Sequence, residues 1–141
     1  MILRIGHINI RTPILEETLA FYESVLAMRR GPARTMADQS RNAWLYDDAG
    51  RALIHVNMPA ADEAVPDVGA RGRIDHVAFD GRDPDEMEAR LQRLGIAYRR
   101  SETLVSGLTQ IVLRDPNGIM LELAFGTDLA LDSQRSGGNG V

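Results

Sequence analysis

The sequence predicts an α+β fold made of two βαβββ modules in tandem. Two observations carry this prediction. The order strand, helix and three strands is read twice along the chain. Chemically matched residues also recur at a near-constant offset: His7 precedes His76 by 69 residues, and His55 precedes Glu122 by 67. Self-similarity at a fixed period indicates an internal duplication.

The first module is expected over residues 1–58. Its opening strand, "ILRIGHINIR", alternates in polarity, with Ile8 and Ile10 on one face and His7 and Asn9 on the other. This alternation is typical of a strand that is buried on one side only.

A helix is expected to follow in "TPILEETLAFYESVLAM", where the apolar residues have helical spacing. Thr12 is suited to cap this helix and Pro13 to its first turn. "DDAG" at 47–50 has the composition of a turn between two strands. Three strands are expected around residues 28–36, 41–47 and 51–58.

Residues 59–72, rich in Pro, Ala, Gly and charge, are expected to link the modules. The second module is predicted over 73–126, with a helix that Asp83 caps and Gly95 ends. "DPNG" before the last strand predicts a tight turn. The glycine-rich tail, 127–141, is expected to be disordered.

Composition narrows the possible functions. Apolar residues make up 44% of the chain and charged residues 26%, which is typical of a soluble globular domain. A net charge of −4 argues against nucleic acid or an anionic membrane as a partner. The chain has no cysteine and lacks an apolar run of the roughly 20 residues that a membrane span needs. The start has no signal-peptide pattern, so a cytoplasmic protein is expected.

The three histidines of the chain all lie inside apolar strands, and this placement predicts a metal site. His7 and His76 lie at equivalent places on the first strand of each module, and His55 and Glu122 at equivalent places on the last strand. Pseudo-symmetry should direct the four side chains toward one point. Imidazole and carboxylate ligands without cysteine suit Fe, Mn, Ni, Co or Zn. Each histidine alone could be a hydrogen-bonded core residue, but Glu122 would be costly to bury unpaired.

Four further residues are candidate substrate contacts because of their place on the strands. Asn9 shares a face with His7, and Asn57 with His55. Gln110 has the parity expected to point inward, and Trp44 lies near the corresponding place in the first module. Core packing of Trp44 and a solvated rim position for the two asparagines are the alternatives.

The chain resembles the vicinal-oxygen-chelate superfamily, which includes glyoxalase I, methylmalonyl-CoA epimerase, extradiol dioxygenases, and fosfomycin and bleomycin resistance proteins. The resemblance covers residues 1 to about 126 and is carried by "GHINI", "AFYESVLAM", "IDHVAF" and "LRDPNGIMLEL". It implies that the modules form a partly open, eight-stranded mixed barrel around a cleft. It also implies one divalent metal ion per site, with ligands at His7, His76 and Glu122. His55 falls on a fourth place, where glyoxalase I has glutamate and the epimerase glutamine.

The resemblance implies a metal-dependent lyase or isomerase that binds vicinal oxygens of a small substrate and stabilises an enediolate, with Glu122 moving the proton. An Fe(II) extradiol-type dioxygenase, with His55 as acid or base, is the first alternative. Against it, no histidine follows His76 and "LTQIVLRD" contains no tyrosine. A metal-free, drug-sequestering protein is the second alternative. A homodimer is expected, and the sequence leaves open whether one chain or two build each site.

Overall fold

The computed structural model describes residues 1–2, 4–32, 38–65, 67, 72–102 and 107–126. The first module contains β1 (Ile8–Arg11), α1 (Leu15–Leu26), β2 (Arg29–Pro32), η1 (Gln39–Arg41), β3 (Asn42–Tyr46) and β4 (Ala52–Asn57). The second contains β5 (Val77–Gly81), α2 (Pro84–Arg93), β6 (Tyr98–Glu102), β7 (Thr109–Arg114) and β8 (Met120–Phe125). The predicted tandem α+β fold is confirmed. The expected disorder of the tail falls on residues 127–141, outside the described residues.

The two sheets have the same topology, with strand orders β1-β4-β3-β2 and β5-β8-β7-β6. The first and last strands of each module pair in parallel, and the remaining pairs are antiparallel. In β1 and β4, Asn9 lies opposite His55; in β5 and β8, Ala78 lies opposite Glu122. Asn9 and Ala78 each follow a module's first histidine by two residues, so the duplication holds at the level of single residues.

The two helices differ at their N-termini, and only α2 has the N-cap residue that the sequence predicts. Asp83 accepts a hydrogen bond from the backbone N–H of Glu86 at 3.0 Å, which confirms it as the cap of α2. For α1 the predicted cap is wrong, because the helix begins after Ile14 and has no side-chain cap. The Thr12 hydroxyl instead accepts from the N–H of Ile14 and donates to Oδ1 of Asn117 in the other module.

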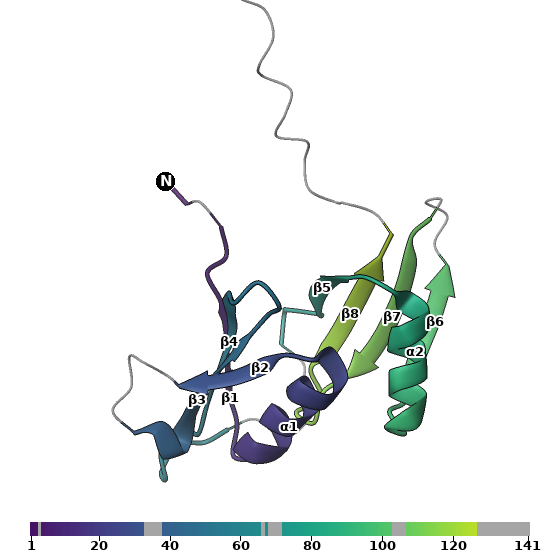
Figure 1. Cartoon of the computed structure of the whole chain (residues 1–141). Helices are drawn as coiled ribbons and strands as arrows, with labels where there is room; N and C mark the ends of the chain where they lie inside the picture. The colour runs from purple at the N-terminus through teal and green to yellow at the C-terminus, as the bar shows by residue number, and fades with distance from the viewer. Residues whose placement is uncertain (3, 33–37, 66, 68–71, 103–106, 127–141) are drawn as a thin grey trace, which may run out of the picture.

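Helices α1 and α2 cover one face of each sheet, and the apolar residues of both modules form a single core on these faces. Figure 1 shows the two sheets side by side, with α1 beside the second module rather than against its own sheet alone. Fully burying one large apolar side chain contributes roughly 1.5–3 kcal/mol. The largest fully buried side chains include Leu19, Tyr22, Leu45, Ile54, Leu91, Ile111 and Leu121. Among the described residues, no helix has the length and apolar character needed to cross a membrane.

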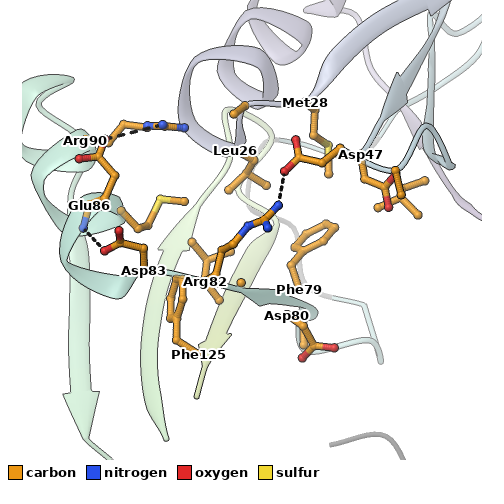
Figure 2. Close-up of a pocket in the computed structure, with 18 of the residues that line it drawn as sticks. Leu26, Met28, Asp47, Phe79, Asp80, Arg82, Asp83, Glu86, Arg90 and Phe125 are labelled. Atoms are coloured by element: carbon orange, nitrogen blue, oxygen red, sulfur yellow. Dashed lines mark hydrogen bonds and ion pairs between the residues drawn. The ribbon is translucent and has the colours of Figure 1, made fainter. Parts of the chain in front are cut away.

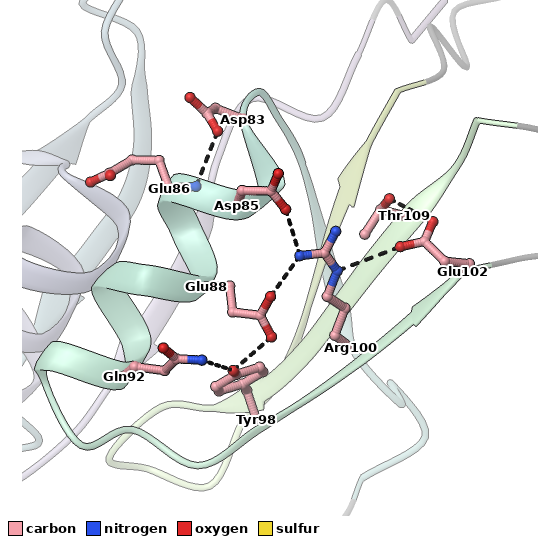
Figure 3. A network of polar contacts seen from close by, with 9 residues as sticks. All are labelled: Asp83, Asp85, Glu86, Glu88, Gln92, Tyr98, Arg100, Glu102 and Thr109. Carbon is pink, nitrogen blue, oxygen red and sulfur yellow. Dashed lines mark hydrogen bonds and ion pairs between the residues drawn. The ribbon is translucent and has the colours of Figure 1, made fainter.

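A network of ionic and polar contacts fastens α2 to β6 (Figure 3). The guanidinium of Arg100 lies 2.8 Å from Asp85 and 2.6 Å from Glu88. The hydroxyl of Tyr98 donates to Glu88 at 2.7 Å and accepts from the amide of Gln92 at 3.0 Å. The Tyr98 hydrogen bond and then Arg100 lower the pKa of Glu88. This network sets the position of α2 on the face of the sheet opposite the candidate site.

A buried carboxylate joins the two modules. Asp115, in the turn before β8, accepts from the backbone N–H groups of Asn117 and Ile119 at 2.9 and 2.8 Å. Its second oxygen accepts from the hydroxyl of Tyr22 in α1 at 3.2 Å. Burial, followed by the charge of Asp115, raises the pKa of Tyr22. The predicted turn at 115–118 is confirmed, and its aspartate also fixes α1 against the second module.

Replacing Asp115 with alanine is expected to lower the free energy of unfolding by about 3 kcal/mol or more. Four donors would lose a hydrogen bond: the backbone N–H groups of Asn117 and Ile119, the hydroxyl of Tyr22 and the side-chain amide of Asn117. An unsatisfied buried polar group costs about 1–3 kcal/mol. Urea unfolding followed by circular dichroism measures the loss. Asp115→Asn is the matched control, because its remaining carbonyl oxygen can still accept from the two backbone groups. An Asp115→Ala midpoint equal to that of wild type would contradict this assignment.

Candidate metal centre

The predicted site residues lie on the sheet faces that the helices do not cover. Residues alternate along a strand, so β4 directs Ile54 and Val56 into the core and places His55 and Asn57 on the opposite face. The same alternation places Glu122 opposite Leu121 and Leu123 in β8. We call these surfaces the first and second polar faces. The first carries His7, Asn9, Asn42, Trp44, His55 and Asn57, and the second carries His76, Gln110 and Glu122.

An aromatic stack organises the first polar face. The imidazole of His55 is stacked on the indole of Trp44, with ring centroids 4.9 Å apart and planes inclined by 13°. His7 meets the same indole edge-on, with centroids 4.6 Å apart. The side-chain amide of Asn9 lies 2.9 Å from Nδ1 of His55. The sequence predicted these four residues for the site, and the structure brings them together.

His55 is the most constrained of the three histidines. Burial, then the neighbouring His7 and Arg11, lower its pKa. Its Nε2 atom is buried and has no hydrogen-bond partner among the residues that the structure describes. Two amide oxygens on the same face share this property, Oδ1 of Asn42 and Oδ1 of Asn57. Buried polar atoms are normally paired, so this face has unused hydrogen-bonding capacity.

On the second polar face, His76 and Glu122 lie next to each other. Nε2 of His76 is 3.8 Å from a carboxylate oxygen of Glu122. Nδ1 of His76 is 3.0 Å from the carboxylate of Asp75, and this hydrogen bond, followed by the charge of Glu122, raises the pKa of His76. The amide of Gln110 donates to the other oxygen of Glu122 at 2.8 Å. Both side chains are therefore oriented by neighbours that leave one atom of each facing the other.

One chain does not bring the four predicted ligands to a common point. Within the described ranges, no three side chains of His, Asp or Glu lie close enough together to hold a metal ion. The physical reason is the contact of α1 with the second module through Tyr22 and Asp115. This contact joins the modules through their helix side, so the two polar faces are not pressed together.

The structure shows which residue of the first module corresponds to Gln110, and it adds two residues to the candidate site. Asn42 lies opposite Asn57, as Gln110 lies opposite Ala124, so Asn42 and not Trp44 corresponds to Gln110. Trp44 lies opposite His55. Sequence reasoning missed Asn42, which only the strand register reveals. It also missed Asp75, although its position next to His76 was a usable signal.

A groove of about 660 Å³ lies elsewhere, between the modules (Figure 2). Leu26, Phe79 and Phe125 give it an apolar lining, and Arg82 bridges its rim to Asp48 at 2.8 Å. None of the predicted ligands or substrate contacts lines it. The volume of this groove therefore does not indicate the position of the candidate metal site.

Comparisons with known proteins agree on the fold. The family model described as the Glyoxalase/Bleomycin resistance protein/Dioxygenase superfamily matches residues 4–123. The fosfomycin resistance protein FosX of Listeria monocytogenes is 21% identical, with 90% of this chain and 96% of that chain covered and a TM-score of 0.67. A glyoxylase/bleomycin resistance protein/dioxygenase domain from Frankia sp. EAN1pec is 19% identical, with 91% and 95% covered and a TM-score of 0.70.

A third similar structure, a glyoxalase family protein described as putative from Bacillus anthracis, is 23% identical, with 90% and 98% covered and a TM-score of 0.65. Among curated proteins, the search found no match to this chain. At these identities the structural neighbours establish the architecture, while the chemistry has to be argued from the residues of this chain.

Proposed function

Because this chain belongs to the Glyoxalase/Bleomycin resistance protein/Dioxygenase superfamily, we propose that it is a divalent-metal-dependent enzyme acting on a small molecule with two neighbouring oxygens. The observation that carries the proposal is the geometry of His76 and Glu122. Two groups that can both donate lone pairs face each other at 3.8 Å, a separation that suits two ligands of one cation.

The surroundings of this pair fit a metal. Metal-binding histidines commonly donate their second ring N–H to a carboxylate, which fixes the tautomer and the ring orientation. Asp75 supplies that carboxylate for His76. Gln110 holds one oxygen of Glu122 and leaves the other toward His76. In this proposal His76 and Glu122 are two ligands, and Asp75 and Gln110 orient them.

The third ligand in the proposal is His7, supplied by a second copy of the chain. Ile5 and Ile74, each two residues before a module's first histidine, are 84% and 82% exposed. Among the described strands, β1 pairs only with β4, and β5 only with β8, so the first strand of each module is a free edge of its sheet. Free edges and exposed apolar side chains favour association. A homodimer that places the first polar face of one copy against the second polar face of the other completes the ligand set.

A divalent cation held there would act as a Lewis acid toward two adjacent oxygens of the substrate. The chain contributes the rest of the chemistry. Glu122, half-buried and held by Gln110, is placed to take a proton from the substrate and return it, as lyase or isomerase chemistry requires. Trp44, Asn57 and Asn42 offer an aromatic surface and two amide oxygens that have no partner in the described chain.

Metal titration of the purified protein tests the proposal. With Mn, Fe, Co, Ni and Zn offered separately, isothermal titration calorimetry is expected to show about one site per chain for at least one of them. A protein that takes up none of the five would contradict the proposal and favour the sequestering function. Oxygen consumption with catechols, measured on the iron-loaded protein, separates a dioxygenase from the lyase or isomerase that we propose, for which no consumption is expected.

A further inference from the structure

The side-chain amide of Asn9 lies between two atoms of His55. Its Nδ2 atom is 2.9 Å from Nδ1 of the imidazole and 3.3 Å from the backbone carbonyl oxygen of the same residue. A carbonyl oxygen can only accept a hydrogen bond, so the group of Asn9 that faces it is the NH2 group. Turning the amide over would place two oxygens in contact.

The orientation of Asn9 decides the tautomer of His55. Because the NH2 group also faces Nδ1, that nitrogen accepts a hydrogen bond and carries no proton. A neutral imidazole must then carry its proton on Nε2. With a proton in place, Nε2 has no lone pair to offer a metal ion. This is the atom that is buried without a partner.

The aromatic stack fixes the direction of this N–H group. Trp44 lies nearly parallel to the imidazole, so rotation of the ring out of its plane is blocked on that side. Asn9 holds the Nδ1 edge, while Nε2, on the opposite edge, is buried and has no hydrogen-bond partner among the described residues. A donor held in this way, before any acceptor arrives, is what stabilisation of an oxyanion requires.

We propose that His55 is a neutral hydrogen-bond donor to a substrate oxyanion, held in the Nε2–H tautomer by Asn9, and is neither a metal ligand nor a proton-transfer group. Proton transfer from Nε2 would leave the ring as an imidazolate anion, because Nδ1 already lacks a proton. This inference rests on the proposed function, since it assigns a role at the same site. Asn9 is then a positioning residue.

The tautomer can be observed directly by two-bond ¹H–¹⁵N correlation NMR of the imidazoles, with the zinc-loaded and metal-free protein. With only three histidines, His7→Gln and His76→Gln assign the signals. We expect the His55 proton on Nε2 in both states. Asn9→Asp replaces the donor with an acceptor and is expected to move the proton to Nδ1. An unprotonated Nε2 in the wild-type protein, or no change in Asn9→Asp, would overturn the inference.

Binding measurements separate this inference from the proposed function. His55→Phe keeps an aromatic ring on Trp44 and removes both nitrogens. We expect its zinc affinity to stay within about threefold of wild type, because His55 is not a ligand. His7→Gln removes a proposed ligand and should lose at least about 100-fold. Oxalate, a probe with vicinal oxygens, should bind zinc-loaded His55→Phe roughly tenfold more weakly.

If His55→Phe loses zinc as strongly as His7→Gln, or binds oxalate as wild type does, the inference fails while the metal site stands. If wild-type protein binds no zinc, manganese, iron, cobalt or nickel, the proposed function fails, and the role of His55 at that site fails with it. The NMR measurement on metal-free protein still decides the tautomer by itself.

Discussion

Replacing Glu122 with glutamine is expected to weaken divalent-metal affinity by at least about 100-fold. Residues that only orient a ligand typically cost roughly 10- to 100-fold, so the loss of a ligand should reach or pass the upper end of that range. The variant removes the sole carboxylate among the three proposed ligands. Its amide retains an oxygen that can accept from Gln110, so the local structure should survive. A competition titration against a chromophoric chelator measures the affinity.

Glu102→Gln is the matched control, because Glu102 lies in the same sheet and is mostly exposed, on β6. Its metal affinity should equal that of wild type. Equal affinities for Glu122→Gln and Glu102→Gln would show that Glu122 is not a ligand. The unfolding midpoints of both variants, measured without metal, report whether either substitution changes stability.

The local features of this fold could be predicted from the sequence because they depend on short-range patterns. Alternation of apolar residues located β1 and β4 and correctly placed His55 and Asn57 on one face. Cap chemistry located α2, since Asp83 needs only the nearby N–H of Glu86. The duplication was visible because it repeats both the order of elements and the spacing of His7 and His76.

The arrangement of the two modules depends on contacts between distant residues, which no local pattern indicates. Tyr22 and Asp115 are 93 residues apart in sequence, and Thr12 and Asn117 are 105 apart. These contacts direct the helix faces toward the shared core, so pseudo-symmetry alone did not bring the ligands together in one chain. Thr12 illustrates the competition, because its hydroxyl is used in this contact instead of capping α1.

Strand register limited the prediction of substrate contacts. Gln110 lies on the face of Glu122, as predicted. Trp44 was predicted near the corresponding place in the first module, but the strand pairing gives that place to Asn42. Pairing partners decide which positions are equivalent, and a register shift between Leu45 and Tyr46 is not marked in the sequence. The roles of His7, His76 and Glu122 as metal ligands stay predictions, and for His55 we propose hydrogen-bond donation in place of the predicted coordination.

Mixed dimers of His7→Ala and His76→Ala chains are expected to bind about one metal ion per dimer, although neither variant alone retains a complete site. In a dimer whose sites combine the first polar face of one copy with the second polar face of the other, the two substitutions fall in the same site. The other site then keeps His7 from one chain, and His76 and Glu122 from its partner. Two different affinity tags allow the mixed dimer to be purified free of both homodimers.

The metal content of this mixed dimer tests most directly whether two copies build each site. The control pairs a wild-type chain with a His7→Ala/His76→Ala double variant, so that each shared site contains one substitution. Our account predicts about one metal ion in the first dimer and none in the control. The reverse result, with metal only in the control, would show that a single chain builds the site and would contradict the account.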